Sequence, residues 1–171
     1  AVKGSGIRDL SSSIKSLNLK NLPGTEARRF LLHRPPMLLV DRLLSFSDDT
    51  AECGFRISAE NAFLISGFGV PAYISIEYMA QCIAVHAGVR AYLSGRPLPI
   101  GFLLGSRQLE LHDDYLEEGR DYLTTCRKLL QGADGMGSFE CNITSDGRLI
   151  SKGRLAVLER HDDEKFGLRV S

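Results

Sequence analysis

The sequence predicts a single α+β domain in which a curved antiparallel sheet of about six strands wraps around one long central helix. Three observations predict it: one continuous helix-like run at 71–93, several short strand-like runs separated by turn residues, and the order of two strands, one helix and four strands. A helix of about 23 residues spans roughly 35 Å at 1.5 Å per residue. That length suffices to lie along such a sheet.

The first two strands are expected to form a hairpin. The run 37–46 is followed by the turn-forming residues 47–50 and then by a second run in which apolar and polar residues alternate. Alternation of this kind places one set of side chains on the core face of a sheet. In the second run the set expected to face the core is Ala51, Cys53, Phe55 and Ile57.

The run 71–93 is the strongest helix signal in the chain. Pro71 suits the first helical position, and Gly95 with Pro97 ends the run. Repeated alanines keep this helix slim, so we expect it to be buried on most sides. Four strand-like runs follow, and turn residues separate the last three as hairpins. They lie near 99–111, 120–131, 137–145 and 148–159.

Composition excludes several classes of function. The 171 residues are 43% hydrophobic, which suits one compact domain. Lys plus Arg equals Asp plus Glu at 21 each, so net charge favours neither nucleic acid nor an anionic membrane. The four cysteines lack a CxxC pair, which argues against a zinc site or a disulfide framework and favours reduced thiols. No cofactor is expected. Without a signal peptide or an 18-residue apolar run, a cytoplasmic protein with no membrane segment is expected.

Domain boundaries follow from changes in composition. Residues 1–30 contain glycines, a run of serines and scattered lysines, with weak apolar periodicity. We expect an N-terminal arm that is flexible or a cloning remnant. The folded domain is expected at 31–160, and 161–171 form a charged C-terminal tail.

Glu77 is the leading site candidate because it is isolated. It is the only formally charged side chain between Ala62 and Val89, and it lies near the start of the predicted helix. A buried carboxylate without a partner is costly, which favours the protonated form, and a protonated glutamic acid can act as a general acid. The alternative is a structural carboxylate that caps the helix or pairs with Arg107.

Two motifs carry a family resemblance. The run HRPPMLLVDR at 33–42, followed by EYMAQ at 77–81, resembles the hot-dog-fold 3-hydroxyacyl-[acyl-carrier-protein] dehydratases, and the branch associated with aryl polyene synthesis, the ApeP-like proteins, fits better still. The resemblance covers approximately residues 30–160. It implies a hot-dog fold, and dehydration of 3-hydroxyacyl thioesters on acyl carrier protein to trans-2-enoyl thioesters in fatty-acid-like or aryl polyene synthesis.

One departure from this family is large. The usual dehydratases carry a histidine in the loop before the helix, whereas the loop at 66–71 contains none. Since active sites in the family lie at a dimer interface, we hypothesise that the chain supplies Glu77 to a hetero-oligomer with a histidine-bearing hot-dog partner; a homodimer is the alternative. Within this chain, His33 is the reserve candidate for the missing catalytic histidine. The alternative is that its imidazole has a structural role and anchors the chain before the first strand. His86 should face away from Glu77, and His112 is expected at the surface. His161 lies in the charged tail, and we expect no specific role for it.

The reaction suggests roles for further residues. Dehydration requires a base for the C2 proton and an acid for the departing C3 hydroxyl, and the acid would be Glu77. Gln81, one helical turn later, either orients the catalytic groups or is a buried amide that satisfies backbone carbonyls. Backbone N–H groups at the helix start could bind the thioester oxygen, although a tight turn explains the glycines equally well. This substrate-binding set is Gly67, Phe68, Gly69, Val70, Pro71 and Ala72.

Two other functions remain open at this point. One is a hot-dog acyl thioesterase, and the other is a non-catalytic companion subunit of an active dehydratase. The basic residues Arg28, Arg29 and Arg34 could meet an acidic carrier protein or form a solvated surface.

Overall fold

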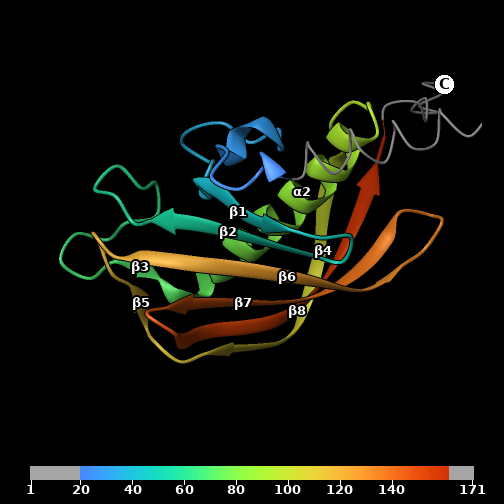
Figure 1. Cartoon of the computed structure of the whole chain (residues 1–171). Helices are drawn as coiled ribbons and strands as arrows, with labels where there is room; N and C mark the ends of the chain where they lie inside the picture. Colours follow the sequence, from blue (N-terminus) through green and yellow to red (C-terminus); the bar gives the residue numbers. More distant parts are fainter. Residues whose placement is uncertain (1–19, 162–171) are drawn as a thin grey trace, which may run out of the picture.

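One long helix lies along the concave face of a curved antiparallel sheet in the computed structural model, which describes residues 20–161 (Figure 1). The helix is α2 (Ser75–Leu93), preceded by two 3-10 turns, η1 (Ala27–Arg29) and η2 (Ala72–Ile74). The main strands are β1 (Arg42–Phe46), β2 (Thr50–Arg56), β4 (Ile100–Leu111), β6 (Asp121–Gln131), β7 (Met136–Ser145) and β8 (Arg148–Arg160). Two short strands, β3 (Val70–Pro71) and β5 (Tyr115–Leu116), form a separate pair.

The six main strands pair in the order β1-β2-β6-β7-β8-β4, and every pair is antiparallel. The predicted hairpins are confirmed: β1 pairs with β2, β6 with β7, and β7 with β8. In this order β4 is one edge of the sheet and β1 is the other. The expected architecture of about six strands around one helix is therefore confirmed.

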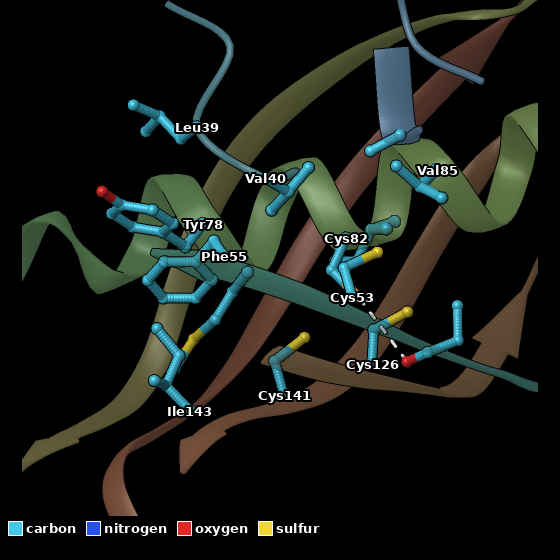
Figure 2. Close-up of a cluster of buried hydrophobic side chains, with 14 of the residues drawn as sticks. Leu39, Val40, Cys53, Phe55, Tyr78, Cys82, Val85, Cys126, Cys141 and Ile143 are labelled. Atoms are coloured by element: carbon cyan, nitrogen blue, oxygen red, sulfur yellow. Dashed lines mark hydrogen bonds between the residues drawn. The ribbon is translucent and has the colours of Figure 1, made fainter. Parts of the chain in front are cut away.

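The core lies between α2 and the concave face of the sheet (Figure 2). Ala51, Cys53, Phe55 and Ile57 are all buried, as the alternation in the second strand predicted. Phe55 stacks on Tyr78 of the helix, with ring centroids 4.1 Å apart. Figure 2 shows the four cysteine side chains gathered in this core, one from the helix and three from the sheet.

Helix α2 is buried on most sides, as expected, with 12 of its 19 residues buried. It begins at Ser75, however, and the prediction of a start at Pro71 is wrong. Pro71 belongs to β3, which pairs with β5. Gly69 permits this pairing because its φ is +116° and a Cβ there would lie 2.3 Å from the carbonyl oxygen of Leu116. The sequence signal missed both short strands, since their pairing is not local.

The segment 20–31 packs on the domain. Leu22, Ala27 and Phe30 are buried, and Glu26 forms a β-bridge with Arg42. This packing differs from the flexible arm expected up to residue 30. The rest of that arm, residues 1–19, and the charged tail from 162 onward lie outside the described residues. Within the described part, no helix is both long and apolar enough to cross a membrane.

Candidate active site

A pocket of about 420 Å³ lies between α2, the start of β4 and the segment 31–33. The helix lines it with residues spaced three or four apart, which places them on one face. From Glu77 to Ala87 this face extends for roughly 15 Å at 1.5 Å per residue. The helical lining consists of Glu77, Ala80, Ile83, Ala84 and Ala87. The alanines leave room that larger side chains would fill, so an elongated apolar ligand would fit along the helix.

Glu77 lies in the first turn of α2 and is half-buried at this pocket. Among the described residues its carboxyl group makes no hydrogen bond or ion pair, so the pairing with Arg107 considered from the sequence is not formed. The first turn of a helix is electrostatically favourable for an acid. A carboxyl group thus reaches an apolar pocket without being committed to a structural partner.

His33 lines the same pocket. Its Nδ1 atom is buried and has no hydrogen-bond partner within residues 20–161. Burial lowers the pKa of His33 from the usual 6.5, while the nearby Glu77 carboxylate raises it in part. The structure therefore brings together two of the residues that the sequence singled out, although they come from different elements.

A second carboxylate, Glu159 of β8, also lines the pocket, but it has partners. Its Oε2 accepts a hydrogen bond from Gln131 at 3.1 Å and lies 3.9 Å from an Arg90 nitrogen. Its Oε1 lies 3.0 Å from Nε2 of His161. Arg90 lies 13 positions after Glu77 on the helix, so Glu159 closes the pocket at the end remote from Glu77.

Gln81 does not face the pocket, and the expectation that it orients the catalytic groups is not supported. Its Oε1 accepts a hydrogen bond from the backbone N–H of Leu39 at 2.8 Å, and its Nε2 donates to the carbonyl oxygen of Met37 at 2.7 Å. The side chain is 1% exposed. Of the two alternatives, the buried amide that satisfies backbone groups is the one present. Gln81 ties the segment before β1 to the helix.

The expected substrate-binding loop also lies elsewhere. None of the residues from Gly67 to Ala72 lines the pocket. The N–H of Gly69 donates to the carbonyl oxygen of Ile65 at 3.0 Å, and the N–H of Ala72 donates to that of Asp114 at 2.9 Å. These two donors are engaged within the fold and are not free to bind a thioester oxygen. The glycines serve the tight turn and the β3–β5 pairing, which was the alternative explanation.

None of the other histidines lines the pocket, and His86 and His112 match the predicted core and surface positions. His161, expected to have no specific role, instead contacts Glu159. His86 is a core imidazole whose Nε2 lies 3.0 Å from the carbonyl oxygen of Asp48 and 3.2 Å from that of Ser47. His112 is a surface residue with Nε2 3.9 Å from Glu110. No group of three or more His, Cys, Asp or Glu side chains suitable for a metal ion occurs within residues 20–161.

Sequence reasoning missed most of the apolar lining. The missed residues come from the segment before the first motif, from the start of β4 and the residue before it, and from β7 and β8. They are Leu31, Leu32, Pro99, Ile100, Leu103, Phe139, Val157 and Leu158. Only the spacing of the helix alanines could have indicated the pocket, because the opposing walls come together through the sheet topology.

These features define a hot-dog-fold protein with a carboxyl group and an imidazole at an apolar pocket. The family model of the ApeP-like proteins, described as ApeP dehydratase, matches residues 25–167. The chain therefore belongs to the ApeP-like dehydratase family.

Relatives agree with this assignment. The chain is 25% identical over 148 residues to a 3-hydroxyacyl-[acyl-carrier-protein] dehydratase FabZ of Coxiella burnetii, a match that covers 84% of this chain and 99% of that protein. It is also similar to a structure of the dehydratase heterocomplex ApeI:P from Xenorhabdus doucetiae, with 28% identity and a TM-score of 0.76. That match covers 82% of this chain and 94% of the other.

A more distant likeness concerns the thioesterase alternative. A hypothetical thioesterase of Streptococcus pneumoniae matches with a TM-score of 0.51 and 12% identity, over 70% of this chain and 85% of the other. At this identity the likeness shows the shared fold alone.

Proposed function

We propose that this chain is a subunit of a hetero-oligomeric dehydratase that converts 3-hydroxyacyl thioesters on acyl carrier protein to trans-2-enoyl thioesters, with Glu77 as the general acid. The observation that carries the proposal is the Glu77 carboxyl group, which reaches an apolar pocket without a hydrogen-bond or ion-pair partner in the described part of the chain. The likeness to a FabZ dehydratase and to the ApeI:P heterocomplex supports it.

The chemistry follows from the pocket. Loss of water breaks the C2–H and C3–O bonds of the substrate, and the departing hydroxyl needs a proton to leave as water. Glu77, as the general acid, supplies that proton. The apolar wall from Ala80 to Ala87 holds the acyl chain and keeps bulk water away from the reacting carbons.

A second hot-dog subunit would complete the site at the β4 edge. The pocket lies beside the start of β4, which is an edge strand of the sheet. An edge strand presents unpaired backbone groups that another strand can bind. Phe102 and Leu104 on this strand are 45% and 50% exposed. A partner at this edge would cover them and close the pocket. The alternative is a homodimer, in which a second copy of this chain occupies the β4 edge.

The carrier protein would approach near the segment 31–33. Arg28 and Arg29 are exposed and precede this wall of the pocket by only a few residues. Arg34, in contrast, has a structural role, because its Nη1 donates to the carbonyl oxygens of His33 at 2.7 Å and Leu31 at 2.9 Å. We therefore assign contact with an acidic carrier protein to Arg28 and Arg29.

The test is a Glu77→Gln substitution in the chain co-expressed with its hot-dog partner. The substitution keeps the shape of the side chain and removes its acidic proton. With a 3-hydroxyacyl-carrier-protein substrate, we expect the complex to assemble and the enoyl product to fall by 100-fold or more, within the roughly 10²–10⁴-fold range of general acid catalysis. Glu60→Gln, at an exposed position outside the pocket, is the matched control.

Product analysis separates the alternatives. Free acid as the product of the unmodified complex would identify a thioesterase. Unchanged enoyl formation by the Glu77→Gln complex would indicate a companion subunit without catalytic groups and would end the assignment of Glu77.

A further inference from the structure

Three titratable side chains line the pocket: His33, Glu77 and Glu159. Glu159 is engaged by Gln131, Arg90 and His161 at the remote end. His33 and Glu77 have no such partners among the described residues, and the Glu77 carboxylate partly offsets the lowering of the His33 pKa by burial. The pocket therefore contains one acid and one imidazole that the fold leaves uncommitted.

The state of the imidazole suits a base. Its Nδ1 atom is buried without a hydrogen bond in the described part of the chain, an arrangement that is unfavourable and calls for an explanation. Burial is the main influence on the pKa of His33 and lowers it from 6.5. At neutral pH the ring is therefore uncharged, and one of its nitrogens has a lone pair that can accept a proton.

The backbone that bears His33 is held on both sides. Arg34 donates hydrogen bonds to the carbonyl oxygens of Leu31 and His33. Further along, Gln81 fixes Met37 and Leu39 to the helix that also bears Glu77. Groups that take part in proton transfer need such a fixed geometry.

We propose that His33 is the general base of this site, so that one chain carries both titrating groups and needs no histidine from the loop before the helix or from the partner. The proposal rests on the function proposed for Glu77. His33 takes the proton from C2, and the electrons of the C2–H bond form the C2=C3 double bond. The C3–O bond breaks, and the oxygen leaves as water with the proton of Glu77.

The same pair also completes the cycle. After water departs, an imidazolium and a carboxylate face one pocket. Transfer of the proton from His33 back to Glu77 restores both groups without any other reactant. This return path distinguishes a pair within one pocket from two groups that act separately.

The experiment uses the co-expressed complex and a 3-hydroxyacyl-carrier-protein substrate. His33→Gln and His33→Ala are compared with His112→Gln, a surface histidine outside the pocket. Because the His33 ring makes no hydrogen bond within the described residues, both variants should fold and assemble, as circular dichroism and gel filtration will check. We expect kcat to fall 10²–10⁴-fold, the range for a general base, with little change in KM.

Two further readouts separate a base from a structural residue. Added imidazole should restore part of the activity of His33→Ala and leave His33→Gln unchanged. A substrate deuterated at C2 should show a larger isotope effect on kcat in the variants, because removal of the C2 proton becomes slower.

The outcomes are distinct. If His33→Gln retains kcat within twofold of the unmodified complex while Glu77→Gln is inactive, the proposed function stands and the base comes from the partner. If Glu77→Gln is also fully active, the proposed function itself fails. Loss of activity in both variants, with rescue by imidazole, supports the pair.

Discussion

The carbonyl oxygen of Phe30 lies against Gly88 of helix α2, so closely that a Cβ at Gly88 would be 1.7 Å from it. Phe30 also packs its ring edge-on against Tyr92, with centroids 5.9 Å apart. The next residues along the chain, 31–33, form one wall of the pocket. The contact between Gly88 and Phe30 therefore sets how closely that wall approaches the helix.

Gly88→Ala should destabilise the protein strongly, although alanine favours helix. The methyl group would overlap a backbone oxygen that cannot move without displacing the segment, and overpacking of this kind costs roughly 1–3 kcal/mol. We expect the free energy of unfolding in urea to fall by about 3 kcal/mol, at the upper end of that range. Gly105→Ala, where nothing lies within 4 Å of the added atom, is the control. Equal stability of the two variants would contradict the close contact.

Gln81→Leu should destabilise the fold because it removes hydrogen bonds in a buried region. The N–H of Leu39 and the carbonyl of Met37 would lose their partner, at roughly 1–3 kcal/mol for each group left unpaired. Gln81→Glu keeps an acceptor for Leu39 but loses the donor to Met37, so an intermediate loss is expected. Urea denaturation of the three proteins measures this order. A stable Gln81→Leu variant with reduced kcat would instead point to a role in catalysis.

Stability should decrease as pH falls below 6.5 because His86 is buried in its neutral form. Its Nε2 faces two carbonyl oxygens and must carry the hydrogen, which leaves Nδ1 bare and buried. Burial lowers the pKa of His86 in the folded state from 6.5, and the charges of Arg90 and Lys128 lower it further. The hydrogen bond to the Asp48 backbone raises the pKa in part, but the net shift is downward. The unfolded chain then binds more protons between the folded pKa and 6.5, so the free energy of unfolding declines as pH drops through this window.

Denaturation in urea at several pH values between about 8 and about 5 tests this pH dependence, because that range includes the usual histidine pKa of about 6.5. The His86→Gln variant should show a shallower decline. His33 acts in the same direction, since burial also lowers its pKa, so the slope should shrink without vanishing. An identical slope in the variant would exclude His86 as the cause.

The four cysteines should be unreactive in the folded protein. All four are free and buried between α2 and the sheet. Burial raises the pKa of the Cys82 and Cys141 thiols, and the contact with Cys82 raises that of Cys126. Since the thiolate is the reactive form, a thiol reagent such as Ellman's should label none of them in native buffer and all four in denaturant. Rapid labelling of the native protein would show that this core opens.

Ala84→Leu should shorten the space available to an acyl chain. Ala84 is partly exposed and lines the pocket two helical turns beyond Glu77, so a leucine there would occupy part of the pocket volume. We expect KM to rise tenfold or more, about 1.4 kcal/mol, for long acyl chains and to change little for short ones. Kinetics with a series of 3-hydroxyacyl chain lengths will measure this. An equal change in KM for all acyl-chain lengths would show that the acyl chain binds outside this part of the pocket.

Sequence alone determined the long helix, the six main strands and their order along the chain. Alternation from Ala51 to Ile57 predicted the core face of β2, and the apolar run before Gly95 predicted α2, because the periodicities of strands and helices are local properties. The isolation of Glu77 among uncharged residues likewise singled it out without coordinates. Local pattern also predicted the turns, since turn residues act on their own backbone.

Tertiary structure decided which of these residues meet. His33 and Glu77 lie far apart in the chain and share a pocket only because the segment 27–33 packs on α2 at Gly88. Gln81 follows Glu77 by one turn, yet it turns to the backbone of Met37 and Leu39 and away from the pocket. The start of α2 moved to Ser75 because Pro71 pairs with a strand more than forty residues later. Contacts of this kind depend on how the helix and the sheet pack together, and local sequence patterns do not predict that packing.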